Sequence, residues 1–230
     1  MSLKNKAFKT TYNLTHTYNH LLYGDEKNKL CIGFSPRAGC SISFQCYLDL
    51  FGLLPEALKF NSFIHKYRTQ VFNRRIKTKN INTLKNYTFI KFIMNPYIRA
   101  VSIYRLQTSC NLSFRCYLKQ IDNIKFNRQD IFHMQSQYIP GEENIPFNYI
   151  KIDENQCFNF GDIIIDVNKY NSIHHGKKID SITFCGDIPR ETVNQELPSS
   201  YKYFYDDEIK QLVYNIYKQD IDFYKFNFIK

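Results

Sequence analysis

A glycine-containing turn, Gly33-Phe-Ser-Pro-Arg-Ala-Gly-Cys-Ser41, lies between an apolar run and a helical pattern. Backbone N–H groups at the start of a helix bind phosphate, because they point outward at the positive end of the helix dipole. Arg37 adds a cation to the turn. The turn is not a Walker A loop, since five residues separate Gly33 from Gly39 where that motif has four, and no Lys precedes Ser41. We expect an anion site here, and the alternative is an ordinary strand-to-helix turn.

A second turn of the same kind lies near the middle of the chain, at Phe92-Ile-Met-Asn-Pro-Tyr-Ile-Arg-Ala-Val-Ser-Ile-Tyr104. On the helix predicted to follow, Arg99 and Ser102 are three residues apart and therefore lie on neighbouring faces. A cation and a hydroxyl near the start of a helix can bind an anion. The spacing predicts a second anion site, and the alternative is a surface Arg beside a capping Ser.

Together the two turns resemble the nucleotide-binding elements of sulfotransferases, which use 3′-phosphoadenosine-5′-phosphosulfate (PAPS) as the sulfuryl donor. In that family, a first loop of the pattern Pro-Lys/Arg-x-Gly-Thr/Ser-Thr/Ser holds the 5′-phosphosulfate, and Pro36-Arg-Ala-Gly-Cys-Ser41 is similar to it. A second element of the pattern Arg-Asp-Pro-x-x-Arg-x-x-Ser-x-Tyr holds the 3′-phosphate, and Met94-Asn-Pro-Tyr-Ile-Arg-Ala-Val-Ser-Ile-Tyr104 is similar to that one.

Three later segments resemble the Golgi carbohydrate sulfotransferase group: His133-Met-Gln-Ser-Gln137, Tyr149-Ile-Lys-Ile-Asp-Glu154 and Ile216-Tyr-Lys-Gln-Asp-Ile-Asp-Phe223. The resemblance covers about residues 30–226, with the motifs in the family's order. It implies a P-loop-like three-layer α/β fold, with a central parallel sheet flanked by helices. It also implies an enzyme that transfers a sulfuryl group from PAPS to a hydroxyl acceptor, a glycan or glycoconjugate, without a metal.

The resemblance also implies roles for individual residues. Arg37, with the backbone amides around Gly39 to Ser41, would stabilise charge on the leaving phosphate. Arg99 and Ser102 would hold the 3′-phosphate, and Lys177 or Lys178 would lie near a phosphate in a polar loop that closes over the nucleotide. The residues expected to contact the donor are Pro36, Arg37, Ala38, Gly39, Cys40, Ser41, Arg99, Ser102 and Lys177.

Two residues depart from the family's pattern. Met94 stands where the family has the Arg that binds the 3′-phosphate, so a main charge contact is missing, and Arg99 or Arg105 would substitute for it. Cys40 replaces a hydroxyl residue of the first loop, which leaves Ser41 as the side-chain contact there. An alternative interpretation is therefore a sulfotransferase-fold protein that has lost catalysis.

Sulfuryl transfer also needs a general base, because the acceptor hydroxyl must lose a proton. Related enzymes use a His or a Glu in the segment that follows the first loop. His65, in Phe63-Ile-His-Lys-Tyr67, is the first candidate, followed by His133 and then Glu56. The alternative for each is a histidine held by ordinary packing, or a solvated surface acid.

The elements that must position these residues alternate between strands and helices. Short apolar runs closed by proline or polar residues predict buried strands, and apolar residues at helical spacing predict helices. This alternation indicates an α/β fold with a parallel sheet, in a single domain after an irregular or helical lead-in at 1–28. We expect strands at 30–35, 87–94 and 147–152, and helices at 41–54, 55–79 (one or two), 97–108, 113–121 and 206–226.

The net charge of +10 is concentrated in the first part of the chain. Residues 1–130 carry 21 Lys and Arg against 6 Asp and Glu, whereas residues 131–230 carry 10 against 15. Such asymmetry indicates an anionic partner for the N-terminal part. The run 66–79 contains six cations and no acid, so a basic nucleic-acid-binding protein is a further alternative. The lack of a nucleic-acid recognition motif and the acidic C-terminal part argue against it.

Composition excludes several other classes of protein. A hydrophobic content of 43% excludes wholesale disorder, and no apolar run is long enough to cross a membrane. The first residues lack the apolar segment of a secretory signal. Seven cysteines without a Cys-x-x-Cys pair argue against a zinc site and a disulfide framework. We therefore expect a cytoplasmic or otherwise soluble intracellular protein with free thiols.

Overall fold

The structure is a computed structural model, and it describes residues 22–25, 29–35, 37–72, 86–106, 111–121, 136–138, 141–152, 157–160, 163–166, 186–187 and 201–228. The chain forms two compact units. Unit 1 consists of residues 1–11, 95–138 and 174–230, and unit 2 consists of residues 12–94 and 139–173. Each unit is described here by itself.

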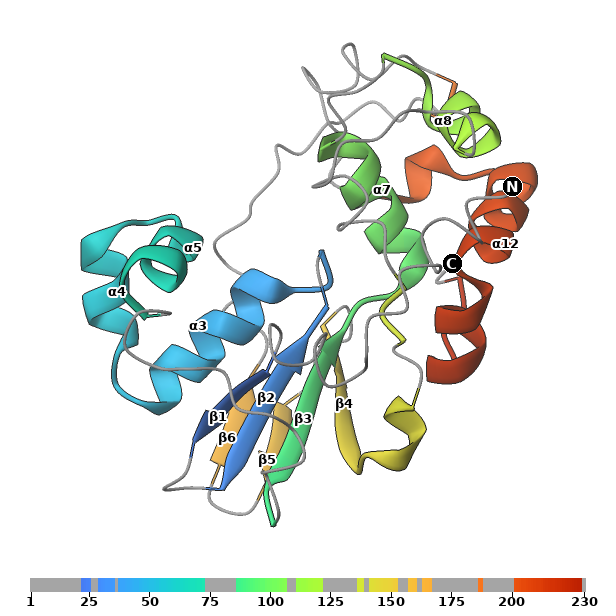
Figure 1. The fold of residues 1–230 in the computed structure, drawn as a ribbon. Coiled ribbons are helices and arrows are strands. Elements are labelled where there is room, and N and C mark those ends of the chain that lie inside the picture. The colour runs from blue at the N-terminus through green and yellow to red at the C-terminus, as the bar shows by residue number, and fades with distance from the viewer. Residues whose placement is uncertain are drawn as a thin grey trace. The chain divides into compact units, whose positions relative to one another are not determined.

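Unit 2 is built on a four-stranded sheet with the order β1-β2-β3-β4 (Figure 1). Strands β2, β3 and β4 run parallel, and β1 pairs antiparallel with β2. Phe34 of β2 pairs with Phe92 of β3, so the segments that follow these strands leave the same edge of the sheet. The strands are β1 (Leu22–Asp25), β2 (Leu30–Phe34), β3 (Thr88–Ile93) and β4 (Phe147–Lys151).

The central strands of this sheet are buried on both faces. All five residues of β2 are buried, as are five of the six residues of β3, which explains why both strands are nearly continuous apolar runs. Lys91 is a charged residue among the buried apolar residues of β3. Its ammonium group donates a hydrogen bond to the Glu142 carboxylate at 2.5 Å, and both side chains are buried. The pair satisfies two charges that would otherwise be costly inside the unit.

Helices and a hairpin complete unit 2. Helix α3 packs against β2, and buried aromatic side chains, among them Phe34, Phe44 and Phe72, fill the core beside it. The elements are α3 (Cys40–Leu50), α4 (Leu54–Phe60), α5 (Ile64–Tyr67), the π-helical turn η1 (Arg68–Phe72), the 3₁₀ turn η3 (Glu142–Asn144) and the antiparallel hairpin of β5 (Cys157–Phe160) and β6 (Ile163–Asp166).

Unit 1 is helical in its described part. Helices α7 (Pro96–Leu106), α8 (Phe114–Gln120) and α12 (Asp207–Tyr224) pack around an aromatic core together with the 3₁₀ turn η4 (Tyr201–Phe204). The Ser113 side chain caps α8, and the Asp206 side chain caps α12.

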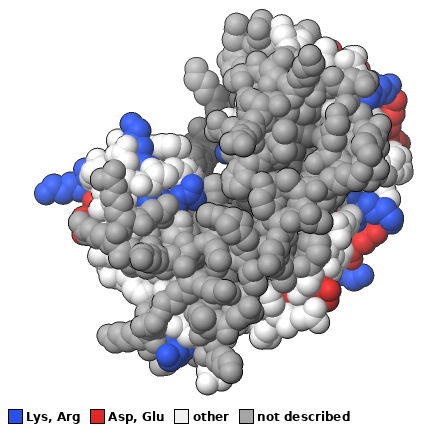
Figure 2. Space-filling model, viewed as in Figure 1, with Lys and Arg blue, Asp and Glu red and all other residues white. Residues whose placement is uncertain are grey.

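On the surface of unit 1, Arg115 binds Asp187, Asp206 and Glu208. Figure 2 shows Lys and Arg side chains next to Asp and Glu side chains on the face that it draws. The hydrogen bond from Arg115 lowers the pKa of the Asp206 carboxyl group. The carboxylate therefore contributes stability that is present above its usual pKa and is lost as the pH falls below that range.

The predicted mixed α/β architecture with a largely parallel sheet is confirmed. The structure differs from the expected elements at three places in unit 2. Strand β1 occupies part of the expected irregular lead-in, and the predicted helix 41–54 ends at Leu50. The hairpin β5–β6 was not predicted. The finer prediction, a sulfotransferase-type three-layer fold, stays a prediction.

Candidate functional site

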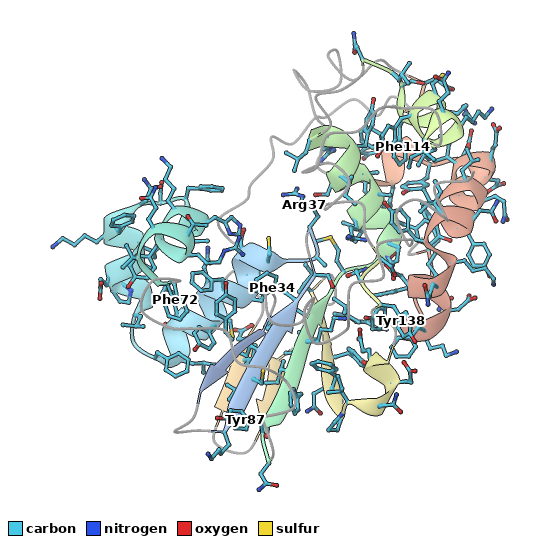
Figure 3. The ribbon with its side chains drawn as sticks, in the orientation of Figure 1. Phe34, Arg37, Phe72, Tyr87, Phe114 and Tyr138 are labelled. Atoms are coloured by element: carbon cyan, nitrogen blue, oxygen red, sulfur yellow. The ribbon has the colours of Figure 1, made fainter. Side chains whose placement is uncertain are left out.

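The segment between β2 and α3 forms a tight turn at the end of a buried strand. The backbone N–H of Ala38 donates to the Ser35 carbonyl at 3.0 Å. Arg37 (φ 58°) and Gly39 (φ 77°) both adopt left-handed backbone conformations, which reverse the chain within a few residues. Figure 3 shows Arg37 beyond the end of β2, where its half-buried side chain belongs to the turn and not to a helix face.

Gly39 is fixed in this turn by both its conformation and its surroundings. It precedes α3 as the N-cap residue, and its carbonyl accepts the Ser43 backbone N–H at 2.9 Å and the Ser43 hydroxyl at 2.8 Å. A Cβ atom at position 39 would lie 2.5 Å from Cδ1 of Ile152. Because a glycine has no side chain to cap the helix, α3 begins without a side-chain cap. Its first backbone N–H groups can therefore donate hydrogen bonds to an anion.

The structure brings His65 to the start of α3. Nε2 of His65, on α5, lies 2.8 Å from Oγ of Ser41 and 3.6 Å from Sγ of Cys40. All three side chains are half-buried. Two residues predicted for the first loop therefore contact the first candidate for the general base, although Ser41 and His65 are 24 positions apart in the sequence.

The packing behind this contact is apolar and aromatic. The Phe63 ring packs edge-on against the His65 ring, with centroids 5.1 Å apart. The guanidinium carbon of Arg68 lies 5.6 Å from the centre of the Phe34 ring. Within the run 66–79, Arg68 is half-buried, whereas Lys66 is exposed. Burial raises the pKa of Tyr23 to about 12, against the opposing effect of Arg68. Tyr23 is thus a neutral packing partner at physiological pH.

Glu56, the third base candidate, lies on the exposed side of α4. Its carboxylate accepts a hydrogen bond from the Tyr67 hydroxyl at 3.1 Å. This bond joins α4 to α5, the helix that carries His65. The structure therefore places Glu56 where it supports the position of α5.

The second predicted anion element, from residue 95 onward, belongs to unit 1 and consists there of Asn95 and helix α7. The Asn95 side chain accepts the Tyr97 backbone N–H at 3.1 Å and donates to the Asn227 carbonyl at 2.8 Å. Arg99 is fully buried, lies 3.7 Å from Asp220 and has its guanidinium 5.7 Å from the centre of the Tyr217 ring. Arg99 is thus an interior side chain of the unit and not the surface Arg of the alternative interpretation.

Ser102 and Met94 are two further residues of this element to which the sequence assigns a place. Ser102 is half-buried on α7, three residues beyond Arg99. Met94, the first residue of the element, belongs to unit 2 and packs half-buried against that unit's hydrophobic core. The side chain that stands at the family's Arg position therefore contributes to packing, and the use of Arg99 and Ser102 for a 3′-phosphate stays a prediction.

Asp220 is a residue to which the sequence reasoning gave no role. It is fully buried on α12 and accepts hydrogen bonds from the backbone N–H groups of Gln137 (2.9 Å) and Tyr138 (3.0 Å), and from the Ser136 hydroxyl. Asp220 thus joins α12 to residues 136–138 and to Arg99 of α7. The signal in the sequence was an acid placed four residues after Ile216 on the apolar face of an amphipathic helix.

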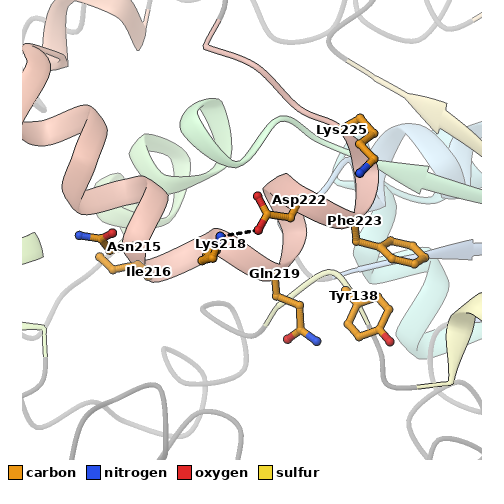
Figure 4. Close-up of a pocket in the computed structure, with 8 residues that line it drawn as sticks. All are labelled: Tyr138, Asn215, Ile216, Lys218, Gln219, Asp222, Phe223 and Lys225. Atoms are coloured by element: carbon orange, nitrogen blue, oxygen red, sulfur yellow. Dashed lines mark hydrogen bonds and ion pairs between the residues drawn. The ribbon is translucent and has the colours of Figure 1, made fainter.

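A cavity of about 850 Å³ lies along α12 in unit 1 (Figure 4). Its lining combines an aromatic pair, Tyr138 and Phe223 with ring centroids 4.6 Å apart, with the ion pair of Lys218 and Asp222 at 2.6 Å. The sequence reasoning did not predict it. The lining residues are Tyr138, Asn215, Ile216, Lys218, Gln219, Asp222, Phe223 and Lys225.

Three predicted site residues, Pro36, His133 and Lys177, lie outside the described residues, as does the part of the basic run beyond Phe72. Within the described ranges, no group of His, Cys, Asp and Glu side chains could hold a metal ion. No helix in that same part of the chain is long and apolar enough to span a membrane. Comparisons of the chain with protein-family models, with curated proteins and with solved structures find no match.

Proposed function

We propose that this protein transfers a sulfuryl group from PAPS to the hydroxyl group of an acceptor, a carbohydrate. One observation carries the proposal: the 2.8 Å contact between Ser41 in the candidate donor loop and Nε2 of His65. A base must lie next to the loop that holds the donor, because the acceptor hydroxyl loses its proton where the sulfuryl group arrives.

The donor loop suits a phosphosulfate group in two respects. Helix α3 begins without a side-chain cap, and Arg37 supplies a cation. Arg37 and the amides around Gly39 to Ser41 would hold the group and stabilise negative charge on it. PAPS, when bound, supplies an activated sulfuryl group and a phosphate as the leaving group.

The remaining residues act on the acceptor and on the second phosphate. His65 takes the proton of the acceptor hydroxyl at Nε2, the ring atom that now contacts Ser41. The expectation from the sequence that Arg99 and Ser102 hold the 3′-phosphate stays a prediction, because Arg99 is fully buried beside Asp220. Positioning and charge stabilisation are the main contributions of the protein in transfer reactions of this kind.

Replacing Arg37 by Ala is expected to weaken binding of adenosine-3′,5′-bisphosphate by about 1.5–3 kcal/mol, because a charge-assisted hydrogen bond is lost. Isothermal titration calorimetry of the full chain measures the loss. The matched control is Lys59→Ala, which removes the same charge from an exposed position on α4 and should leave the affinity unchanged. An unchanged affinity in Arg37→Ala would remove this loop from the site.

Modification of Cys40 with N-ethylmaleimide is expected to abolish nucleotide binding, because the adduct fills the start of α3 next to Ser41. The variant Cys40→Ser, which places a hydroxyl residue there as in the sulfotransferase pattern, should bind the nucleotide both before and after treatment with the reagent. Cys31 is buried, with its pKa raised to about 12, and will not react, whereas exposed Cys116 on α8 reacts in both proteins. Mass spectrometry locates the adduct, and full nucleotide binding by protein modified at Cys40 would contradict the assignment.

A further inference from the structure

The cavity along α12 lies within unit 1, and none of its lining residues has a role in the proposed function. Its volume of about 850 Å³ falls in the range of small-molecule sites, roughly 300–1,000 Å³. The rings of Tyr138 and Phe223 belong to its lining, with centroids 4.6 Å apart (Figure 4). The backbone N–H of Tyr138 donates to the buried carboxylate of Asp220 at 3.0 Å. The cavity therefore offers a ligand an aromatic surface whose backbone is held in place.

Several polar groups of the lining are already paired. Lys218 donates to the Asp222 carboxylate at 2.6 Å and to the Tyr214 hydroxyl at 2.8 Å, and this hydroxyl donates to Asp222 at 3.3 Å. The hydrogen bond from Lys218 lowers the pKa of Asp222, so the pair stays charged at physiological pH. The side-chain oxygen of Asn215 accepts from the Gln211 amide at 3.0 Å. The charges of Lys218 and Asp222 therefore neutralise each other.

The polar groups that remain are mainly hydrogen-bond donors. Among the described residues, no hydrogen bond engages the side chains of Gln219 and Lys225 or the amide nitrogen of Asn215. The other acids of α12 do not lie beside Lys225, because two are in the first turn, at the opposite end of the helix, and Asp220 is buried. The Lys225 ammonium group is thus the charge of the described lining that a ligand would meet.

We propose that this cavity binds a small aromatic carboxylate, whose ring packs against Tyr138 and Phe223 and whose carboxylate pairs with Lys225. Aromatic rings in contact are stabilised beyond their buried area, and an ammonium group forms charge-assisted hydrogen bonds with a carboxylate. One cation suits a carboxylate with its single charge better than a phosphate group, which carries about −1.5 to −2 at neutral pH. The inference goes beyond the proposed function and does not depend on it, since no part of this cavity contacts the candidate donor loop.

The probe is 2-naphthoate, and 2-naphthylmethanol, which has the same rings without the charge, is the comparison. The chain contains no tryptophan, so the fluorescence of the naphthyl group reports binding to the full chain. We expect saturable binding of 2-naphthoate, at least about tenfold tighter than that of the alcohol, because only the naphthoate forms a charge-assisted contact. Equal affinities for the two probes, or no saturable binding of 2-naphthoate, would overturn the proposal.

Three variants locate the binding. Lys225→Gln should lower the affinity for 2-naphthoate to that for the alcohol, whereas Phe223→Leu should weaken both probes by about fivefold, because a ring contact is lost. The control Lys202→Gln removes the same charge from an exposed position outside the cavity and should bind as wild type does.

Thermal unfolding shows which variants are folded, because Lys225 ends α12, where a cation is favourable, and Phe223 is half-buried. Lys225 is exposed, so its variant keeps the test decisive if Phe223→Leu does not fold. Folded Lys225→Gln that binds 2-naphthoate as tightly as wild type, or an equal loss in Lys202→Gln, would show that the carboxylate does not pair with Lys225 in this cavity and would overturn the proposal.

Discussion

Replacing His65 by Ala is expected to lower kcat by about 10²–10⁴-fold, the usual contribution of a positioned general base. The reason is the placement of Nε2 within 2.8 Å of the donor-loop residue Ser41. Affinity for adenosine-3′,5′-bisphosphate should change little, because the loop amides and Arg37 remain. Steady-state assays with labelled PAPS measure the rate, and calorimetry measures the affinity.

The pH profile gives a second readout for His65. A protonated imidazole has no lone pair to accept the acceptor's proton, so the wild-type rate should fall as the pH decreases through the range in which histidines titrate. The matched comparison is His133→Ala. If that variant alone is inactive while it still binds the donor, His65 is a packing residue and His133 is the base.

Replacing Asp220 by Ala is expected to destabilise unit 1 by about 3–5 kcal/mol, because it leaves the fully buried Arg99 without its carboxylate. The backbone amides of Gln137 and Tyr138 lose their acceptor at the same time. A loss of this size corresponds to a decrease in Tm of roughly 10 °C for a chain of this length. Thermal unfolding followed by circular dichroism measures it.

Two further variants show whether the loss of stability in Asp220→Ala comes from the lost charge or from the lost hydrogen-bond acceptors. Asp220→Asn keeps the shape and one acceptor oxygen, so it should retain part of the stability but lose the ion pair with Arg99. Asp222→Ala, two residues along the same helix, removes an exposed partner of Lys218 and should leave Tm nearly unchanged. Equal Tm values for Asp220→Ala and Asp222→Ala would show that the buried contacts do not hold the segment 136–138.

The strands with strong local patterns could be predicted from the sequence. β3 is a run of β-branched and aromatic residues, and its predicted position differs from the observed one by one residue at each end. The helix predicted to span 41–54 was too long because Gly52 adopts a left-handed conformation (φ 67°) after Leu50, and a new helix, α4, begins at Leu54 with Pro55 in its first turn. β1 was missed because its four residues become a strand only by pairing with β2.

The candidate site was predictable in its residue types but not in its contacts. The glycine, the cation and the hydroxyl of the first turn can be read along the chain, whereas the approach of His65 to Ser41 depends on how α4 and α5 fold back toward α3. Burial of Arg99 against Asp220 is likewise a tertiary property, since 121 residues separate the two in the sequence. No periodicity distinguishes such a buried pair from two surface charges.

Titration of the wild-type chain with adenosine-3′,5′-bisphosphate, in parallel with adenosine-5′-monophosphate, tests the central claim most directly. The account predicts saturable binding of the bisphosphate, at least about tenfold tighter than that of the monophosphate, because the 3′-phosphate adds a charge-assisted contact. The binding should persist in the presence of arbitrary DNA. Equal affinities for both nucleotides, no binding of either, or displacement by DNA in a salt-dependent manner would contradict a PAPS site in this protein.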